Sequence, residues 1–180
     1  MFQGYYPPHS YGRIDRPHVQ QCVVSAVLLR DMGKERRPVA VQFFGYIFGL
    51  YPDGTGDHLL KLCRKEGISF CTYSGIGGCG KAVIQTFIPE TGEFESTVIE
   101  GMLELAGLTG NIISDDEGVL YHHTHAVFAY KSGAEHLIAA GHIKSVTVSN
   151  TAEITLKPVT DGIIKRQFDP ETGTGFWRFD

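Results

Sequence analysis

The chain has 180 residues, of which 42% are apolar and 20% are charged, and its 16 Lys and Arg against 20 Asp and Glu give a formal net charge of −4. This composition is typical of one soluble globular domain and excludes a disordered chain. No apolar run approaches the roughly 18 residues of a membrane-spanning helix. Residues 1–10 lack the pattern of a signal peptide, so we expect a cytoplasmic protein.

The four cysteines form no Cys-x-x-Cys pair and lie in apolar or glycine-rich surroundings; they are Cys22, Cys63, Cys71 and Cys79. This arrangement favours reduced, structural thiols over a disulfide framework. Cys79 is also a candidate reactive thiol in an exposed turn, because Lys81 beside it would lower its pKa. The sequence pairs no base with it.

Charge is spread unevenly along the chain. Residues 1–40 carry six Lys and Arg against three acids, whereas Pro89–Gly118 carries eight acids and no Lys or Arg. Such a middle region would repel a phosphate backbone. A DNA-binding surface would therefore have to come from the N-terminal arm or from a groove between subunits.

The predicted elements follow in chain order. Residues 1–20 show no helical or strand period and predict an arm. The clearest helix lies between Asp53 and Gly67, where Asp53 or Thr55 can cap the start and Gly67 can end it. The other predicted elements are strands, at Cys22–Leu29, Val39–Leu50, Ile68–Ser74, Ala82–Ile88, Phe94–Glu100, Met102–Ile113, Val119–Tyr130, Leu137–Ile143 and Ala152–Val159. We therefore predict an α/β (α+β) domain dominated by strands, with a few helices.

The segment Gly75–Lys81 reads Gly-Ile-Gly-Gly-Cys-Gly-Lys and resembles two phosphate-binding motifs. Both need a helix after the glycines, and the phosphate-binding loop needs Ser or Thr where this chain has Ala82. A strand follows instead. We predict a tight turn between two strands, in which glycine supplies positive φ angles and close backbone approach.

Five of the eight histidines, from His122 to His142, fall within 21 residues. On a strand, His123 and His125 project from one face and His122 from the other. Two imidazoles about 7 Å apart at Cα can reach one metal ion, and a hairpin would bring His142 alongside them. Three neutral imidazoles leave one coordination position open, which favours zinc or another borderline divalent metal.

Alternatives remain for each of these residues. His123 and His125 would otherwise be exposed strand histidines or donors to backbone carbonyls. Glu153 is a candidate partner for a metal-bound imidazole, or else a solvent-facing strand carboxylate. His136, beside Glu135, is expected in solvent.

The order of these pieces resembles the PPC (plants and prokaryotes conserved) domain family from about residue 46 to residue 158. The motifs that carry the resemblance are the helix Gly56–Cys63, the segment Tyr73–Gly78, the strand Leu103–Ile112 with its Leu-Thr-Gly-Asn, His123-x-His125, Gly141-His142 and Thr151–Glu153. The resemblance implies a mixed fold around a largely antiparallel sheet, a homotrimer, and a metal site at His123, His125 and His142. The chain departs from the family at Ala140, where a second Gly is usual, and at Phe128–Lys131, where a more polar stretch is usual.

Members of this family are often described as DNA-binding. In plant relatives, a separate AT-hook with an Arg-Gly-Arg-Pro core enters the minor groove. This chain has no such core, because its nearest strings, Arg13–Pro17 and Glu35–Pro38, lack the glycine. The DNA-binding description therefore transfers weakly.

We predict an N-terminal arm with leading strands (residues 1–44), a PPC-like domain (45–159) and a C-terminal extension packed on it (160–180). The first functional hypothesis is a trimer whose three histidines hold a divalent metal, zinc in the first place, for small-molecule binding or an unidentified reaction. The second is a DNA-associated regulatory or scaffold protein acting through the trimer. The third is a nucleotide-dependent enzyme at Gly75–Lys81. No catalytic residue, substrate or membrane partner is assigned.

Overall fold

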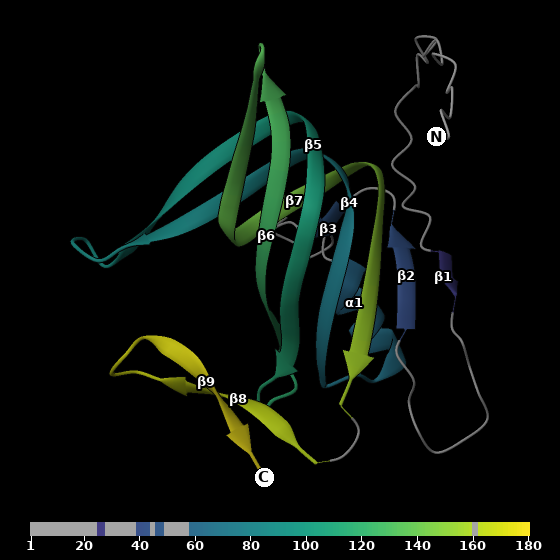
Figure 1. Cartoon of the computed structure of the whole chain (residues 1–180). Helices are drawn as coiled ribbons and strands as arrows, with labels where there is room; N and C mark the ends of the chain where they lie inside the picture. Colours follow the sequence, from purple (N-terminus) through teal and green to yellow (C-terminus); the bar gives the residue numbers. More distant parts are fainter. Residues whose placement is uncertain (1–24, 28–38, 44–45, 49–57, 160–161) are drawn as a thin grey trace, which may run out of the picture.

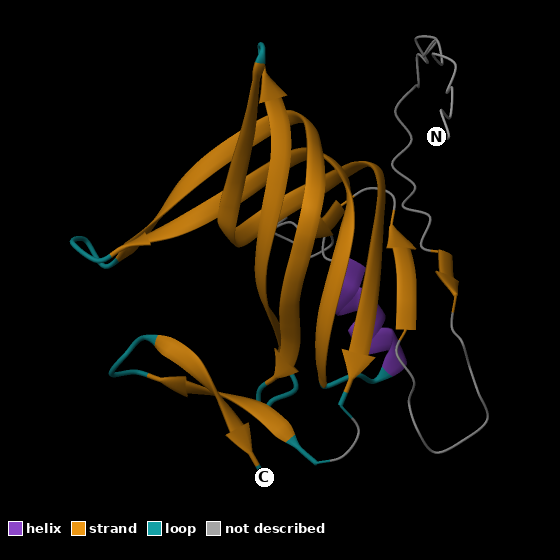
Figure 2. Ribbon diagram, in the orientation of Figure 1, coloured by secondary structure: helices purple, strands orange, loops and turns teal. Residues whose placement is uncertain are grey.

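The computed structural model describes residues 25–27, 39–43, 46–48, 58–159 and 162–180 (Figure 1). The described elements are β1 (Ser25–Val27), β2 (Val39–Phe43), β3 (Tyr46–Phe48), α1 (His58–Glu66), β4 (Phe70–Ile88), β5 (Glu93–Ser114), β6 (Leu120–Ser132), β7 (Glu135–Pro158), β8 (Ile164–Asp169) and β9 (Thr174–Phe179). Strands dominate, and α1 is the one helix of this described part (Figure 2).

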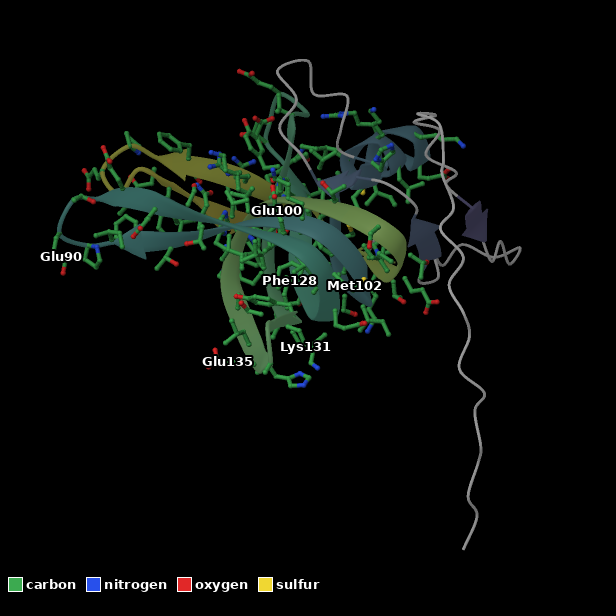
Figure 3. All side chains as sticks on the ribbon, turned by 90° about the horizontal axis from the view of Figure 1, so that it is seen from above. Glu90, Glu100, Met102, Phe128, Lys131 and Glu135 are labelled. Carbon is green, nitrogen blue, oxygen red and sulfur yellow. The ribbon has the colours of Figure 1, made fainter. Side chains whose placement is uncertain are left out.

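Seven strands form one antiparallel sheet in the order β1-β2-β7-β4-β5-β6, with β3 also paired to β7. Because β6 pairs with β7 as well, the four long strands β4 to β7 form a closed cycle of pairings. Two hairpins project from the curved sheet, one from β4 and β5 and one from β6 and β7 (Figure 1). Figure 3 shows Glu90 at the far end of the first hairpin and Glu135 near the end of the second.

Several strands are longer than predicted, whereas the predicted strand Val39–Leu50 contains two described strands, β2 and β3. Three long strands each join two predicted ones: β4 joins Ile68–Ser74 to Ala82–Ile88, β5 joins Phe94–Glu100 to Met102–Ile113, and β7 joins Leu137–Ile143 to Ala152–Val159. The pairing shifts at irregular positions, for example between Cys79 and Lys81, and then resumes. A bulge of this kind bends a strand without ending it, so local breaks in the pattern do not mark strand ends.

The prediction of a turn at the glycine-rich segment 75–81 is wrong. The segment lies inside β4 and pairs with β5 on one side and with β7 on the other. None of its glycines has a positive φ. Close approach is confirmed: a Cβ on Gly75 would lie 2.5 Å from the backbone oxygen of Glu153, and one on Gly77 would lie 2.5 Å from that of Thr151. The strand that continues after the segment offers no helix N-terminus for a phosphate.

Helix α1 confirms the one helix that was clearest in the sequence. Glu66 is its last residue, and Gly67 follows with a φ of 64°, the left-handed conformation with which glycine commonly ends helices. The predicted caps, Asp53 and Thr55, lie outside the described residues. The helix turns one side into the core with Leu59, Leu62 and Cys63.

The core gathers the apolar side chains of the long strands and α1. Its largest fully buried side chains are Phe128, Leu59, Leu103, Leu105, Ile112, Ile143, Ile154, Leu156 and Val146. The expected antiparallel sheet is confirmed, but the expected α/β domain with a few helices overstates the helical content. The described part holds a single helix of nine residues, and it is too short to cross a membrane.

The C-terminal strands β8 and β9 form a separate two-stranded sheet. The Trp177 ring meets Phe70 of β4 edge to face, with ring centroids 5.1 Å apart. Arg178 donates hydrogen bonds to both carboxylate oxygens of Asp116, at 2.8 and 2.9 Å. These bonds lower the pKa of the Asp116 carboxyl below its ordinary value. The hairpin thus contacts the main sheet, while the division at residues 44 and 159 stays a prediction.

Candidate metal centre

Three histidines meet on one face of the sheet. His123 and His125 lie in β6, and His142 lies in β7, directly opposite His125 in the antiparallel register. Paired residues of antiparallel strands project from the same face, and so do residues two apart in one strand. The strand alternation and the hairpin between β6 and β7 therefore bring the three imidazoles together, as the sequence predicts.

The ring nitrogens of these histidines are close enough to share one ion. The Nε2 atoms of His123 and His125 lie 3.2 Å apart. One ring nitrogen from each of the three residues lies within 4.8 Å of the others. The ring centroid of His142 lies 5.1 Å from that of His123 and 5.4 Å from that of His125. The three side chains form a compact group of nitrogen donors.

This donor set fits a zinc ion. Tetrahedral zinc with Zn–N distances of about 2.0–2.1 Å places two ligand nitrogens roughly 3.3 Å apart. The separation between the Nε2 atoms of His123 and His125 is within about 0.1 Å of that edge. The separations within the group reach up to 4.8 Å, so a bound ion would draw the three ring nitrogens closer together.

The surroundings favour the neutral imidazoles that bind metals. Burial lowers the pKa of His123 below its ordinary value, and the neighbouring His125 lowers it further. Burial is also the main cause that lowers the pKa of His142, followed by the other imidazoles. A metal ion needs the lone pair of an unprotonated imidazole, so these two lowered pKa values favour the form of His123 and His142 that can bind.

A buried polar group lies behind the three histidines. Thr124, between His123 and His125 in sequence, points to the opposite face and is fully buried. Its hydroxyl shares a short hydrogen bond with the phenol of Tyr73 and another, 3.1 Å long, with Nδ1 of His122. This confirms that His122 projects away from the other two histidines. The hydroxyl pair ties β6 to β4 across the intervening strand β5.

Gly110 of β5 explains how Tyr73 fits beneath the site. It pairs with Thr124, and a Cβ at this position would lie 2.4 Å from the backbone oxygen of His123 and 2.6 Å from the hydroxyl of Tyr73. Only glycine leaves that space open. Sequence reasoning did not single out Tyr73 or Thr124; the available signal was a Thr placed on the inward face between two histidines.

Glu153 is not brought to the histidines within the chain. It lies eleven residues beyond His142 in β7 and is exposed. Its neighbour in β4 is Ile76, whereas the neighbour of His142 in β4 is Gln85. The two positions belong to different parts of the long strand pair.

The prediction that Cys79 is a reactive thiol in an exposed turn is wrong. Cys79 is fully buried inside β4, and burial together with the nearby Glu104 raises its pKa to about 12. Lys81 instead forms an ion pair with Glu100, with an N–O distance of 2.6 Å. His136 is exposed, as predicted.

Comparisons with known proteins place this chain in a family. The model of the Plants and Prokaryotes Conserved (PCC) domain matches residues 55–160. No curated protein matches the chain.

Solved structures share the fold. A protein from Bacteroides thetaiotaomicron described as a "putative dna binding protein" has 24% identity and a TM-score of 0.66, with 87% of this chain and 97% of that chain covered. A plant- and prokaryote-conserved (PPC) protein from Pyrococcus horikoshii has 23% identity, coverage of 90% and 97%, and a TM-score of 0.62. A metal-containing protein from Archaeoglobus fulgidus has 24% identity, coverage of 79% and 93%, and a TM-score of 0.62. Together with the motifs of the long strands, the match over more than half of the residues confirms the resemblance, and the chain belongs to the Plants and Prokaryotes Conserved domain family.

Proposed function

We propose that this protein binds one divalent metal ion per chain, zinc in the first place, through His123, His125 and His142. The observation that carries the proposal is the group of three ring nitrogens within 4.8 Å of one another. When bound, zinc would supply a Lewis acid with one coordination position left open. That position would serve small-molecule binding or a reaction not yet identified. The metal-containing relative from Archaeoglobus fulgidus adds support from the same fold.

Metal content tests this proposal. Purified protein is stripped of metal with a chelator, reloaded with zinc and dialysed, and its zinc content is then measured by inductively coupled plasma mass spectrometry. We expect one zinc per chain, lost in the double variant His123→Ala/His125→Ala. His136→Ala is the matched control, because His136 is an exposed histidine of the same hairpin. Wild-type protein that takes up no zinc, or a double variant that takes up as much, would overturn the proposal.

We further propose that the protein is a homotrimer in the cytoplasm. The family resemblance implies the trimer. Several large apolar side chains are also exposed in the isolated chain, including Met102, Val127 and Ile138. Such side chains commonly mark subunit interfaces. Light scattering on a sizing column should give three times the 19.8 kDa of one chain. A monomer at all concentrations would contradict this assembly.

A DNA-associated regulatory or scaffold role, acting through the trimer, is the second candidate. The name of the Bacteroides thetaiotaomicron relative favours it. The six Lys and Arg of residues 1–40 would have to supply the contacts, because Pro89–Gly118 carries eight acids and no Lys or Arg. Binding to a labelled duplex should then weaken steeply with salt. A protein that does not bind the duplex even at low salt would exclude this role.

A further inference from the structure

Neutral polar side chains continue the face of the three histidines onto β4 and β5. Gln85 of β4 stands opposite His142 on one side and opposite Ser96 of β5 on the other. Paired residues share a face, so Gln85 lies beside the imidazole of His142 and Ser96 follows one strand further along the same face. The amide Nε2 of Gln85 donates to Oγ of Ser96 at 3.3 Å. This bond fixes a neutral amide next to the proposed metal centre.

Two phenyl rings adjoin the same edge of the site. Phe94 of β5 is tilted against the ring of His142, with centroids 5.7 Å apart. Phe87 of β4 meets Phe94 edge to face at 5.4 Å. Half of each side chain is still exposed, 52% for Phe94 and 50% for Phe87. The rings therefore form an open apolar wall beside the imidazoles, rather than part of the core.

The cross-strand neighbours of the three histidines include no Lys or Arg, and the exposed Lys144 follows two residues after His142 in β7. The cross-strand neighbours of His123, His125 and His142 are Asn111, Thr109 and Gln85, all neutral. Glu93 and Glu95 alternate with Phe94 along β5 and so project from the opposite face. A phosphate would find no Arg or Lys among these neighbours, although such groups usually bind phosphate in proteins.

We infer that the metal site takes a small aromatic acid, with its headgroup on the metal ion and its ring against Phe94. The inference rests on the proposed function, since the ion supplies positive charge that the cross-strand neighbours of the histidines lack. A single negative charge on the ligand matches one ion with an open position. A flat ring matches the exposed face of Phe94, because aromatic pairs stabilise contacts beyond their buried area.

Two hydroxamic acids with the same metal-binding headgroup test the inference. Benzohydroxamate carries a phenyl ring and acetohydroxamate a methyl group, and both are titrated into zinc-loaded protein by calorimetry. We expect the wild type to bind benzohydroxamate up to about tenfold more tightly, the fold-change that an aromatic contact can supply. Phe94→Ala should lose most of this preference and leave acetohydroxamate binding unchanged. Phe94→Tyr, which keeps the ring, should retain the preference.

Matched controls separate the possible outcomes. Phe168→Ala removes a similarly exposed phenyl ring, 56% exposed, from the β8–β9 hairpin and should keep the wild-type preference. Zinc content and thermal unfolding are measured for every variant before titration. Zinc-loaded wild type that binds both hydroxamates equally, or Phe94→Ala that keeps the preference, overturns the inference alone. Protein that never takes up zinc at the three histidines overturns the proposed function.

Discussion

The phenol of Tyr73 in β4 and the hydroxyl of Thr124 in β6 share a hydrogen bond behind the face that carries the three histidines. The two strands flank β5, and the bond passes over Gly110, which pairs with both residues. Thr124 separates His123 from His125 in sequence. The bond therefore fixes the inward-facing residue of this segment of β6, and the residues on either side of it present their imidazoles on the opposite face.

Removing either hydroxyl should destabilise the fold. Tyr73→Phe leaves the buried Thr124 hydroxyl with only its bond to His122, and we expect a loss of about 1–2 kcal/mol in the free energy of unfolding, measured with urea. Thr124→Val should cost a similar amount. Tyr130→Phe, at a half-buried tyrosine of the same hairpin, should change stability by less than about 0.5 kcal/mol. If the losses simply add in the double variant Tyr73→Phe/Thr124→Val, the two hydroxyls do not interact.

A methyl group at Gly110 should disturb the site from below. Gly110→Ala would place Cβ against backbone of His123 and the ring of Tyr73, and we expect a loss of about 1–3 kcal/mol in the free energy of unfolding. Gly107→Ala is the matched control in the same strand, because a Cβ there meets nothing within 4 Å. Urea unfolding of both variants checks the difference. Equal stability for the two variants would contradict the close approach at Gly110.

The ring of Trp177 should help to hold the β8–β9 hairpin on the main sheet, together with Arg178 and Lys165. Trp177→Ala removes the ring contact with Phe70, and we expect faster hydrogen exchange of the backbone amides in residues 164–169 and 174–179. Phe176→Ala is the control, because Phe176 is exposed and projects from the other face of β9. Similar exchange rates in the two variants would show that the packing of Trp177 does not anchor the hairpin.

Cys79 should make stability fall at high pH. The folded thiol has a pKa raised to about 12, whereas the unfolded thiol titrates near 9.0. Between these values the unfolded chain loses the proton while the folded chain keeps it, so rising pH favours unfolding. We expect the stability advantage of the wild type over Cys79→Ala to shrink from about pH 8 to about pH 10.5, in urea unfolding at each pH. A constant difference would contradict the raised pKa.

Local sequence patterns predict the part of the site that depends on short-range geometry. Strand alternation places His123 and His125 on one face, and a short hairpin brings His142 opposite His125. Gly67 ends α1 for the same local reason, because its backbone adopts a positive φ. Each of these features follows from the few residues around it.

The rest depends on partners far along the chain. The glycines of segment 75–81 suggest a turn locally, yet β5 and β7 pair with both edges of the segment and keep it extended. Phe94 reaches His142 only because β4 and β5 continue as one long hairpin beside β7. Burial of Cys79, which reverses the expected direction of its pKa shift, has the same long-range origin. The pairing register between distant strands determines all three of these features. Local patterns in a single sequence do not reveal that register.

The most direct test of the metal centre is anomalous diffraction at the zinc absorption edge from crystals of the zinc-loaded protein. The account predicts one strong peak per chain, about 2.0–2.1 Å from a ring nitrogen of each of His123, His125 and His142. Crystals saturated with zinc that show no peak between these three rings, or show it only at other residues, would contradict the account.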